Sequence, residues 1–172
     1  MKEIFMWAKM YVRKGLSVIP MLQDENIPAI DWHEYRERKP TVKELEQWLN
    51  KDYNYNIGIV TGIVSRIVVV DIHDINANRD RFISKPRNTP TVDSHRGVHM
   101  YFRPNNPREY VELRTDIPGI SVWGEGEVVL APPSIHPSGH QYFWINDRFS
   151  FSDDWMPKLP SEYVRNEGQH VG

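Results

Sequence analysis

The chain has 172 residues, which suits one domain or one domain with a small appendage, and its 40% hydrophobic and 12% aromatic content argues against global disorder. It contains no cysteine, which excludes a disulfide scaffold, thiol catalysis and cysteine-ligated zinc. No apolar run approaches the ~18 residues that span a bilayer, and no signal-peptide pattern opens the chain. We therefore expect a soluble, cytoplasmic protein that does not act at a membrane.

The first sixty residues alternate between helix and strand. Apolar residues at helical spacing predict a helix over residues 3–14, and a short apolar run predicts a strand over 16–22. Thr41 and Glu44 form a capping-box pattern that starts a second helix. Residues 57–60 then form a second predicted strand.

The next predicted strand is the most apolar. Ile67 to Val70 are four consecutive β-branched residues, which is typical of a strand that is buried on both faces. The strand ends in Asp71 and His73, which project to the same face because side chains alternate along an extended chain. Both side chains can therefore reach one metal ion, although Asp71 as a simple turn cap is an equally good reading of these two residues alone.

The remainder is rich in strands. We predict a short helix within residues 75–87, a domain over 1–160, and a tail or linker over 161–172. The elements together predict an α+β domain with a mixed or mainly antiparallel central sheet. The expected strands are 91–93 and 98–102, joined by a turn at 94–97, a hairpin of 117–123 and 127–131 that turns at 124–126, and a last strand at 141–145.

Charge is distributed unevenly along the chain. The net charge is −2 overall, but residues 79–114 carry a local charge of +4 and the rest of the chain carries −6. A basic segment in an acidic protein is either a phosphate-binding face or an ordinary solvated surface.

Polar residues suited to phosphate lie in the turn at 94–97 and just after it. Ser94, Arg96 and His99 are donors for phosphate oxygens, and Gly97 allows the backbone to approach a ligand closely. A histidine that begins a strand is also a common structural residue. The loop 124–139 is the third polar stretch, and it is either part of a site or only a stiff turn.

Five stretches occur in the order in which the motifs of one family occur. Together they resemble the primase–polymerase (Prim-Pol) domain of the archaeo-eukaryotic primase superfamily, known from bifunctional replication proteins of plasmids and phages. The resemblance runs from about Ala8 to Trp144. The matching stretches are Gly15–Pro20 followed by Trp32, Asn56–Gly62, Ile67–His73, Pro90–Val92 with Ser94–Phe102, and Ala131–Gly139.

This resemblance implies an N-terminal α/β unit beside an RNA-recognition-motif-like unit, with the active site between them. It implies nucleotidyl transfer on DNA, with Mg²⁺ or Mn²⁺ held by acidic residues at the positions of Asp71, His73 and Ser121. Ser94, Arg96 and His99 take the positions that bind the nucleotide. The implied partners are nucleoside triphosphates, single-stranded or primed DNA, and a helicase that is either separate or fused.

The sequence departs from the family pattern at two of the three acids, because position 73 is histidine and position 121 is serine. One carboxylate is a poor ligand set for two Mg²⁺ ions, and imidazole favours Mn²⁺, Co²⁺ or Zn²⁺. Three hypotheses follow: an attenuated primase or DNA polymerase, a degenerate domain that only binds nucleotide or DNA, and, less favoured, a metal-dependent phosphoesterase that uses Asp71, His73 and His99.

Overall fold

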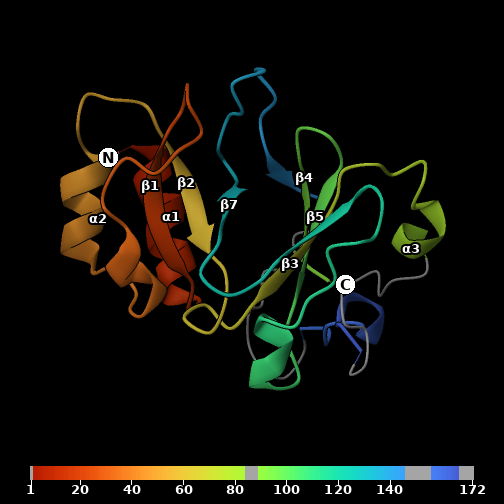
Figure 1. Cartoon of the computed structure of the whole chain (residues 1–172). Coiled ribbons are helices and arrows are strands. Elements are labelled where there is room, and N and C mark those ends of the chain that lie inside the picture. The colour runs from red at the N-terminus through yellow and green to blue at the C-terminus, as the bar shows by residue number, and fades with distance from the viewer. Residues whose placement is uncertain (1, 84–88, 146–155, 167–172) are drawn as a thin grey trace.

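The chain forms two antiparallel sheets with helices on the outside, as a computed structural model describes for residues 2–83, 89–145 and 156–166 (Figure 1). This architecture confirms the predicted α+β class. Within these residues, none of the helices has the length and apolar character needed to cross a bilayer. The first sheet has the order β1 (Ser17–Leu22), β2 (Tyr55–Val60), β7 (Val128–Ala131); the second has the order β6 (Ile120–Trp123), β3 (Val68–Ile72), β5 (Val98–Phe102), β4 (Thr91–Asp93), β8 (Phe143–Trp144).

The first sheet carries the two longer helices, α1 (Glu3–Arg13) and α2 (Val42–Leu49), which lie together at its outer side in Figure 1. The predicted capping box of α2 is present: Thr41 Oγ1 accepts from the Glu44 amide, and the Glu44 carboxylate accepts from the Thr41 amide. Pro20 lies in β1, which is an edge strand of this sheet, where a missing N–H is tolerated.

The second sheet is built around β3, which has a neighbour on each side and separates two hydrophobic cores. Val68, Val69 and Val70 are fully buried, which confirms the prediction of burial on both faces. Side chains alternate between the cores: Val69 packs in the core of the first sheet, while Val68 and Val70 pack in the second core. The short helix α3 (Arg79–Ile83) lies at the far end of this sheet (Figure 1).

The predicted hairpin between β6 and β7 is wrong. Both strands exist, but β6 pairs with β3 in one sheet and β7 pairs with β2 in the other, so the chain crosses between the sheets at residues 124–127. The amide of Thr61 donates to the Glu127 carbonyl, and its hydroxyl donates to the Gly124 carbonyl. Strand β2 pairs with β1 on one side and β3 pairs with β5 on one side. The crossing supplies each of these buried strands with a second partner on its other side.

Residues beyond 160 contribute to the second core. Ser161–Tyr163 form a 3₁₀ helix, and the side chain of Tyr163 is fully buried. The amide of Arg114 donates to the Tyr163 carbonyl, and Leu113 pairs with Val164. Part of the segment that we expected to begin a tail therefore packs on the domain, and residues 167–172 lie outside the described residues.

One buried hydroxyl joins helix α1 to two segments far along the chain. Tyr11 Oη donates to the Pro132 carbonyl at 2.7 Å and accepts from Trp144 Nε1 at 2.9 Å. Burial of this phenol raises its pKa well above the ordinary value. Tyr11 thereby holds the loop after β7 and strand β8 against helix α1.

We expect Tyr11→Phe to lower the free energy of unfolding by about 1–3 kcal/mol, because both hydrogen bonds are lost in a buried place. Urea denaturation followed by circular dichroism measures this loss. Tyr53→Phe is the matched control, since Tyr53 is exposed, and we expect it to change stability by less than about 0.5 kcal/mol. Equal stability of the Tyr11 variant and the parent protein would contradict the prediction.

Candidate functional site

The register of the second sheet brings three predicted site residues into one row. Asp71 on β3 is the pairing partner of His99 on β5 and of Ser121 on β6. Directly paired residues project to the same face of an antiparallel sheet, so these three side chains share the face that Val69 also occupies. The polar row therefore lies on the side of the sheet that faces β7 and the first sheet.

The turn between β4 and β5 lies close to the end of β3. A side chain at Gly97 would overlap the carbonyl oxygen of Ile72, and its Cβ would lie 3.2 Å from the Cα of His73. Only glycine fits this approach, which brings Ser94 and Arg96 beside Asp71 and His73. The structure shows a close approach of Gly97 to the neighbouring strand, and the predicted approach of Gly97 to a ligand stays a prediction.

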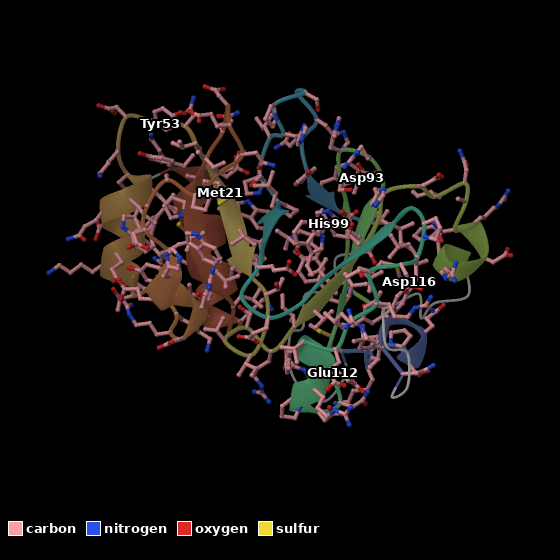
Figure 2. The ribbon with its side chains drawn as sticks, viewed as in Figure 1. Met21, Tyr53, Asp93, His99, Glu112 and Asp116 are labelled. Atoms are coloured by element: carbon pink, nitrogen blue, oxygen red, sulfur yellow. The ribbon has the colours of Figure 1, made fainter. Side chains whose placement is uncertain are left out.

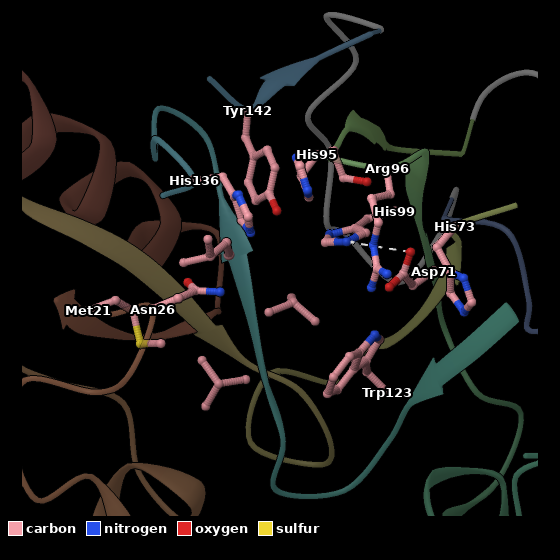
Figure 3. A pocket seen from close by; sticks show the side chains of 14 residues that line it. Met21, Asn26, Asp71, His73, His95, Arg96, His99, Trp123, His136 and Tyr142 are labelled. Atoms are coloured by element: carbon pink, nitrogen blue, oxygen red, sulfur yellow. Dashed lines mark ion pairs between the residues drawn. The ribbon is translucent and has the colours of Figure 1, made fainter. Parts of the chain in front are cut away.

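A cavity of about 380 Å³ lies between the two sheets and is open to solvent (Figure 3). Met21 on the first sheet and His99 on the second lie on its two sides, as Figure 2 shows. Five of the six predicted site residues line it. The lining consists of Met21, Asn26, Asp71, His73, Ser94, His95, Arg96, His99, Trp123, Val128, Val129, Leu130, His136 and Tyr142.

Ser121 is the predicted residue that does not line the cavity. Its position in the register nevertheless places it beside Asp71, and Trp123, two residues further on the same strand face, does line the cavity. The assignment of Ser121 to the third acidic position thus stays a prediction, as do the roles of the other five residues.

His99 is one of the buried polar residues of the cavity. Its side chain is 9% exposed, and its Nδ1 has no hydrogen-bond partner among the described residues. Its Nε2 lies 3.8 Å from Asp71 Oδ1, which is too long for a hydrogen bond. Burial lowers the pKa of His99, and the nearby Asp71 carboxylate opposes this effect, so the ring is neutral at pH 7. A buried imidazole nitrogen without a partner is costly.

Arg96 contributes the positive charge at the cavity. It is solvent-exposed and makes no ion pair with any described residue. Three other arginines of the predicted basic segment are different: Arg81, Arg108 and Arg114 pair with carboxylates. The described part of the segment is therefore not a continuous phosphate-binding face, and Lys85 and Arg87 lie outside the described residues.

The sequence did not single out three rings that line the cavity: His95, His136 and Tyr142. His95 belongs to the turn before β5, whereas His136 and Tyr142 belong to the segment after β7. The loop 124–139 is one of the stretches that the sequence offers as part of a site, and its histidine is the available signal. What the sequence did not reveal is that His95 and His136 stack on each other.

The residues of the cavity do not fit a pair of metal ions. Asp71 is the one carboxylate in the lining, and no three histidine or acidic side chains among the described residues are arranged to hold a metal ion. Two-ion sites need several oxygen ligands, so Asp71 and His73 alone are too few. Among the described residues, the lining includes no second acid to take the place of the carboxylates missing at positions 73 and 121.

Comparison with known protein families supports the resemblance seen in the sequence. Residues 8–162, most of the chain, match the family described as bifunctional DNA primase/polymerase, N-terminal (Prim-Pol). A search of curated proteins gives no match. The match includes both sheets, the row of Asp71, His99 and Ser121, and the turn at 94–97. This chain belongs to the Prim-Pol family of bifunctional DNA primase/polymerase N-terminal domains.

Proposed function

We propose that this domain serves DNA replication by binding a nucleoside triphosphate and single-stranded or primed DNA at the cavity between its sheets, with strongly attenuated nucleotidyl transfer. One observation carries the proposal. The neutral ring of His99 is buried, lacks a partner at Nδ1 among the described residues, and lines an open cavity beside the charge of Arg96.

Phosphate oxygens suit this lining. In a neutral imidazole one nitrogen carries a proton and donates it, and the Arg96 guanidinium donates from a charged group, which makes the stronger bond. Ser94 adds a hydroxyl to the lining of the cavity. The opposite side is apolar, with Met21, Val128 and Leu130, and suits the base or sugar of the nucleotide better than its charged end.

The attenuation follows from the ligands that are missing. Asp71 keeps the first acidic position, but His73 and Ser121 offer no carboxylate, and an Mg²⁺ pair needs oxygen ligands. The same shortage disfavours a metal-dependent phosphoesterase, which would also need a metal held by Asp71, His73 and His99. The lining of the cavity therefore supports nucleotide binding better than it supports nucleotidyl transfer.

Two assays test the proposal on the full chain. Fluorescent dATP binding without added metal should give saturable binding. Primer extension and de novo primer synthesis on single-stranded DNA, with Mg²⁺, Mn²⁺, Co²⁺ or Zn²⁺ supplied separately, should give little or no product. Extension that is robust in any metal and lost in Asp71→Ala would replace attenuation with full activity, and absence of dATP binding would overturn the proposal.

Arg96→Ala should weaken dATP binding about tenfold, because a charge-assisted hydrogen bond to phosphate is lost. The dependence of the dissociation constant on salt should become shallower, since one fewer ionic contact is made. Titrations of dATP at several salt concentrations measure both effects. Arg79→Ala is the matched control, since Arg79 is an exposed arginine on α3 outside the cavity lining. Unchanged affinity of the Arg96 variant would remove this residue from the site.

The cellular setting is also part of the proposal. We infer a cytoplasmic replication protein of a plasmid or phage, because the family resemblance points to such elements and the chain contains no cysteine. Unwinding would come from a helicase partner or a fused helicase domain. Co-purification of the tagged chain from cells that carry the element would identify such a partner.

A further inference from the structure

Two histidines from different sheets stack at the cavity. His95 follows β4 in the second sheet, and His136 follows β7 in the first sheet. Their ring centroids are 3.9 Å apart and their planes differ by 8°. Figure 3 shows both rings beside Tyr142, on the side of the cavity away from His73. The stack therefore brings ring nitrogens from the two sheets together at the cavity.

Ser138 determines where the ring protons lie. Its backbone N–H donates to Nδ1 of His136 at 3.1 Å, so that nitrogen is an acceptor and the proton of the neutral ring is on Nε2. The Ser138 Oγ lies 2.9 Å from the same Nδ1 and 2.9 Å from Nδ1 of His95. The hydroxyl proton therefore points to His136, and Nδ1 of His95 donates to the hydroxyl oxygen. In the neutral His95 ring, Nε2 is then an acceptor.

The other nitrogen of each ring remains for a ligand, and the two differ in character. Nε2 of His136 donates a proton to a hydrogen bond, whereas Nε2 of His95 accepts one. No described residue hydrogen-bonds to either nitrogen, and both rings line the open cavity. The Ser138 hydroxyl spans the two Nδ1 atoms, so the spacing of the stacked rings is one that a single hydroxyl can bridge.

A hydroxyl matches this donor and acceptor better than a phosphate oxygen does. An alcohol donates through its proton and accepts through its lone pairs, whereas an ionised phosphate oxygen only accepts and would face the lone pair of His95. Burial lowers the pKa of His136, so this ring is neutral at pH 7 and keeps the arrangement of protons that Ser138 imposes. The stacked pair is thus suited to an uncharged polar group.

The position of the stack suits the sugar of a bound nucleotide. Arg96 and His99 suit phosphate oxygens, and the apolar side with Met21 suits the base. In Figure 3 the stacked rings lie between Met21 on one side and Arg96 on the other. The sugar joins the base to the phosphates, so it occupies the intervening part of the cavity.

We propose that the stacked pair of His95 and His136, oriented by Ser138, binds the 3′-hydroxyl of the nucleotide sugar. His136 Nε2–H donates to the hydroxyl oxygen, and the hydroxyl donates to Nε2 of His95, with no proton transferred. This inference rests on the proposed function and names the sugar group that the same site recognises. The site therefore distinguishes a nucleotide that carries a 3′-hydroxyl from one that lacks it.

Isothermal titration calorimetry of the full chain with dATP and with 2′,3′-dideoxy-ATP tests this assignment, because the two ligands differ only in the 3′-hydroxyl. At pH 7 the parent protein should bind dATP about tenfold more tightly, since the analogue makes neither hydrogen bond. His136→Phe keeps a ring for the stack but has no nitrogen. Its preference for dATP should fall to less than about twofold, because the donor is lost and the acceptor is no longer held in place.

Two further variants and a ligand without a sugar complete the test. Ser138→Ala removes the hydroxyl that orients both rings from an exposed position, so it should also reduce the preference, and it decides the question if His136→Phe does not fold. His33→Phe is the matched control, since His33 is exposed and outside the cavity lining, and it should keep the preference of the parent protein. Inorganic tripolyphosphate should bind the parent protein and His136→Phe equally. Circular dichroism measures whether each variant is folded.

Failure of this inference is distinguishable from failure of the proposed function. Equal affinity of the parent protein for dATP and the dideoxy analogue would overturn the inference and leave the nucleotide site intact. A preference that persists in folded His136→Phe and Ser138→Ala would place the hydroxyl elsewhere. Loss of tripolyphosphate affinity in His136→Phe would assign the pair to phosphate instead. Absence of binding of either nucleotide by the parent protein would overturn the proposed function as well.

Discussion

Replacing both His73 and Ser121 by aspartate should raise Mg²⁺-supported primer extension by about 100-fold over the parent protein. This factor corresponds to about 3 kcal/mol of transition-state stabilisation, which is within the several kcal/mol that metal ions supply. His73 lines the cavity, and Ser121 is paired with Asp71 across neighbouring strands. Two new carboxylates would therefore join Asp71 on one face and provide the oxygen ligands that Mg²⁺ prefers.

The single variants and an inactive control separate the contributions. His73→Asp and Ser121→Asp alone should each give less than the double variant, because either one leaves two carboxylates instead of three. Asp71→Ala added to the double variant should abolish the gain. Calorimetry with Mn²⁺ provides an independent readout, since metal affinity should increase along the same series. Tighter Mn²⁺ binding without extension would show that the attenuation has a cause other than the missing acids.

Gly97→Ala should lower the free energy of unfolding by about 1–3 kcal/mol and weaken dATP binding at least about tenfold. The new methyl group would overlap the Ile72 carbonyl, so the turn must move away from β3. That movement separates Ser94 and Arg96 from Asp71 and His73. Urea denaturation and dATP titration measure the two effects.

Gly15→Ala is the control for a loss of stability without displacement of the site. Gly15 has a positive φ of 91°, and a methyl group added to it would meet no atom within 4 Å, so alanine costs only backbone strain there. We expect Gly15→Ala to be destabilised with unchanged dATP affinity. If both glycine variants lose affinity in proportion to stability, the position of the turn does not determine binding.

Local patterns in the sequence predicted local structure well. The apolar run before Asp71 correctly predicted that strand β3 is buried on both faces, and Thr41 with Glu44 correctly predicted the capping box of α2. Both features depend on residues that are close together in the sequence. The resemblance in motif order gave the family, which the match over residues 8–162 confirms.

The sequence patterns did not predict which strands, distant along the chain, pair with each other. The glycines at 124 and 126 are typical of a hairpin, yet strands β6 and β7 pair with β3 and β2 in separate sheets. The stack of His95 on His136 likewise depends on two loops that meet only after both sheets have formed. Periodicity and turn patterns contain no information about such contacts.

The crossing between the sheets has a consequence for the thermodynamics of binding. Trp123 and Val128, which line the cavity, flank the crossing at residues 124–127. Backbone hydrogen bonds join the crossing to Thr61, and the Glu125 carboxylate accepts from the Ile63 amide at 2.8 Å. The spacing of the two walls is thus set during folding. A nucleotide that enters this preorganised cavity loses its own conformational entropy, but it does not have to order the walls, so more of the contact energy remains as affinity.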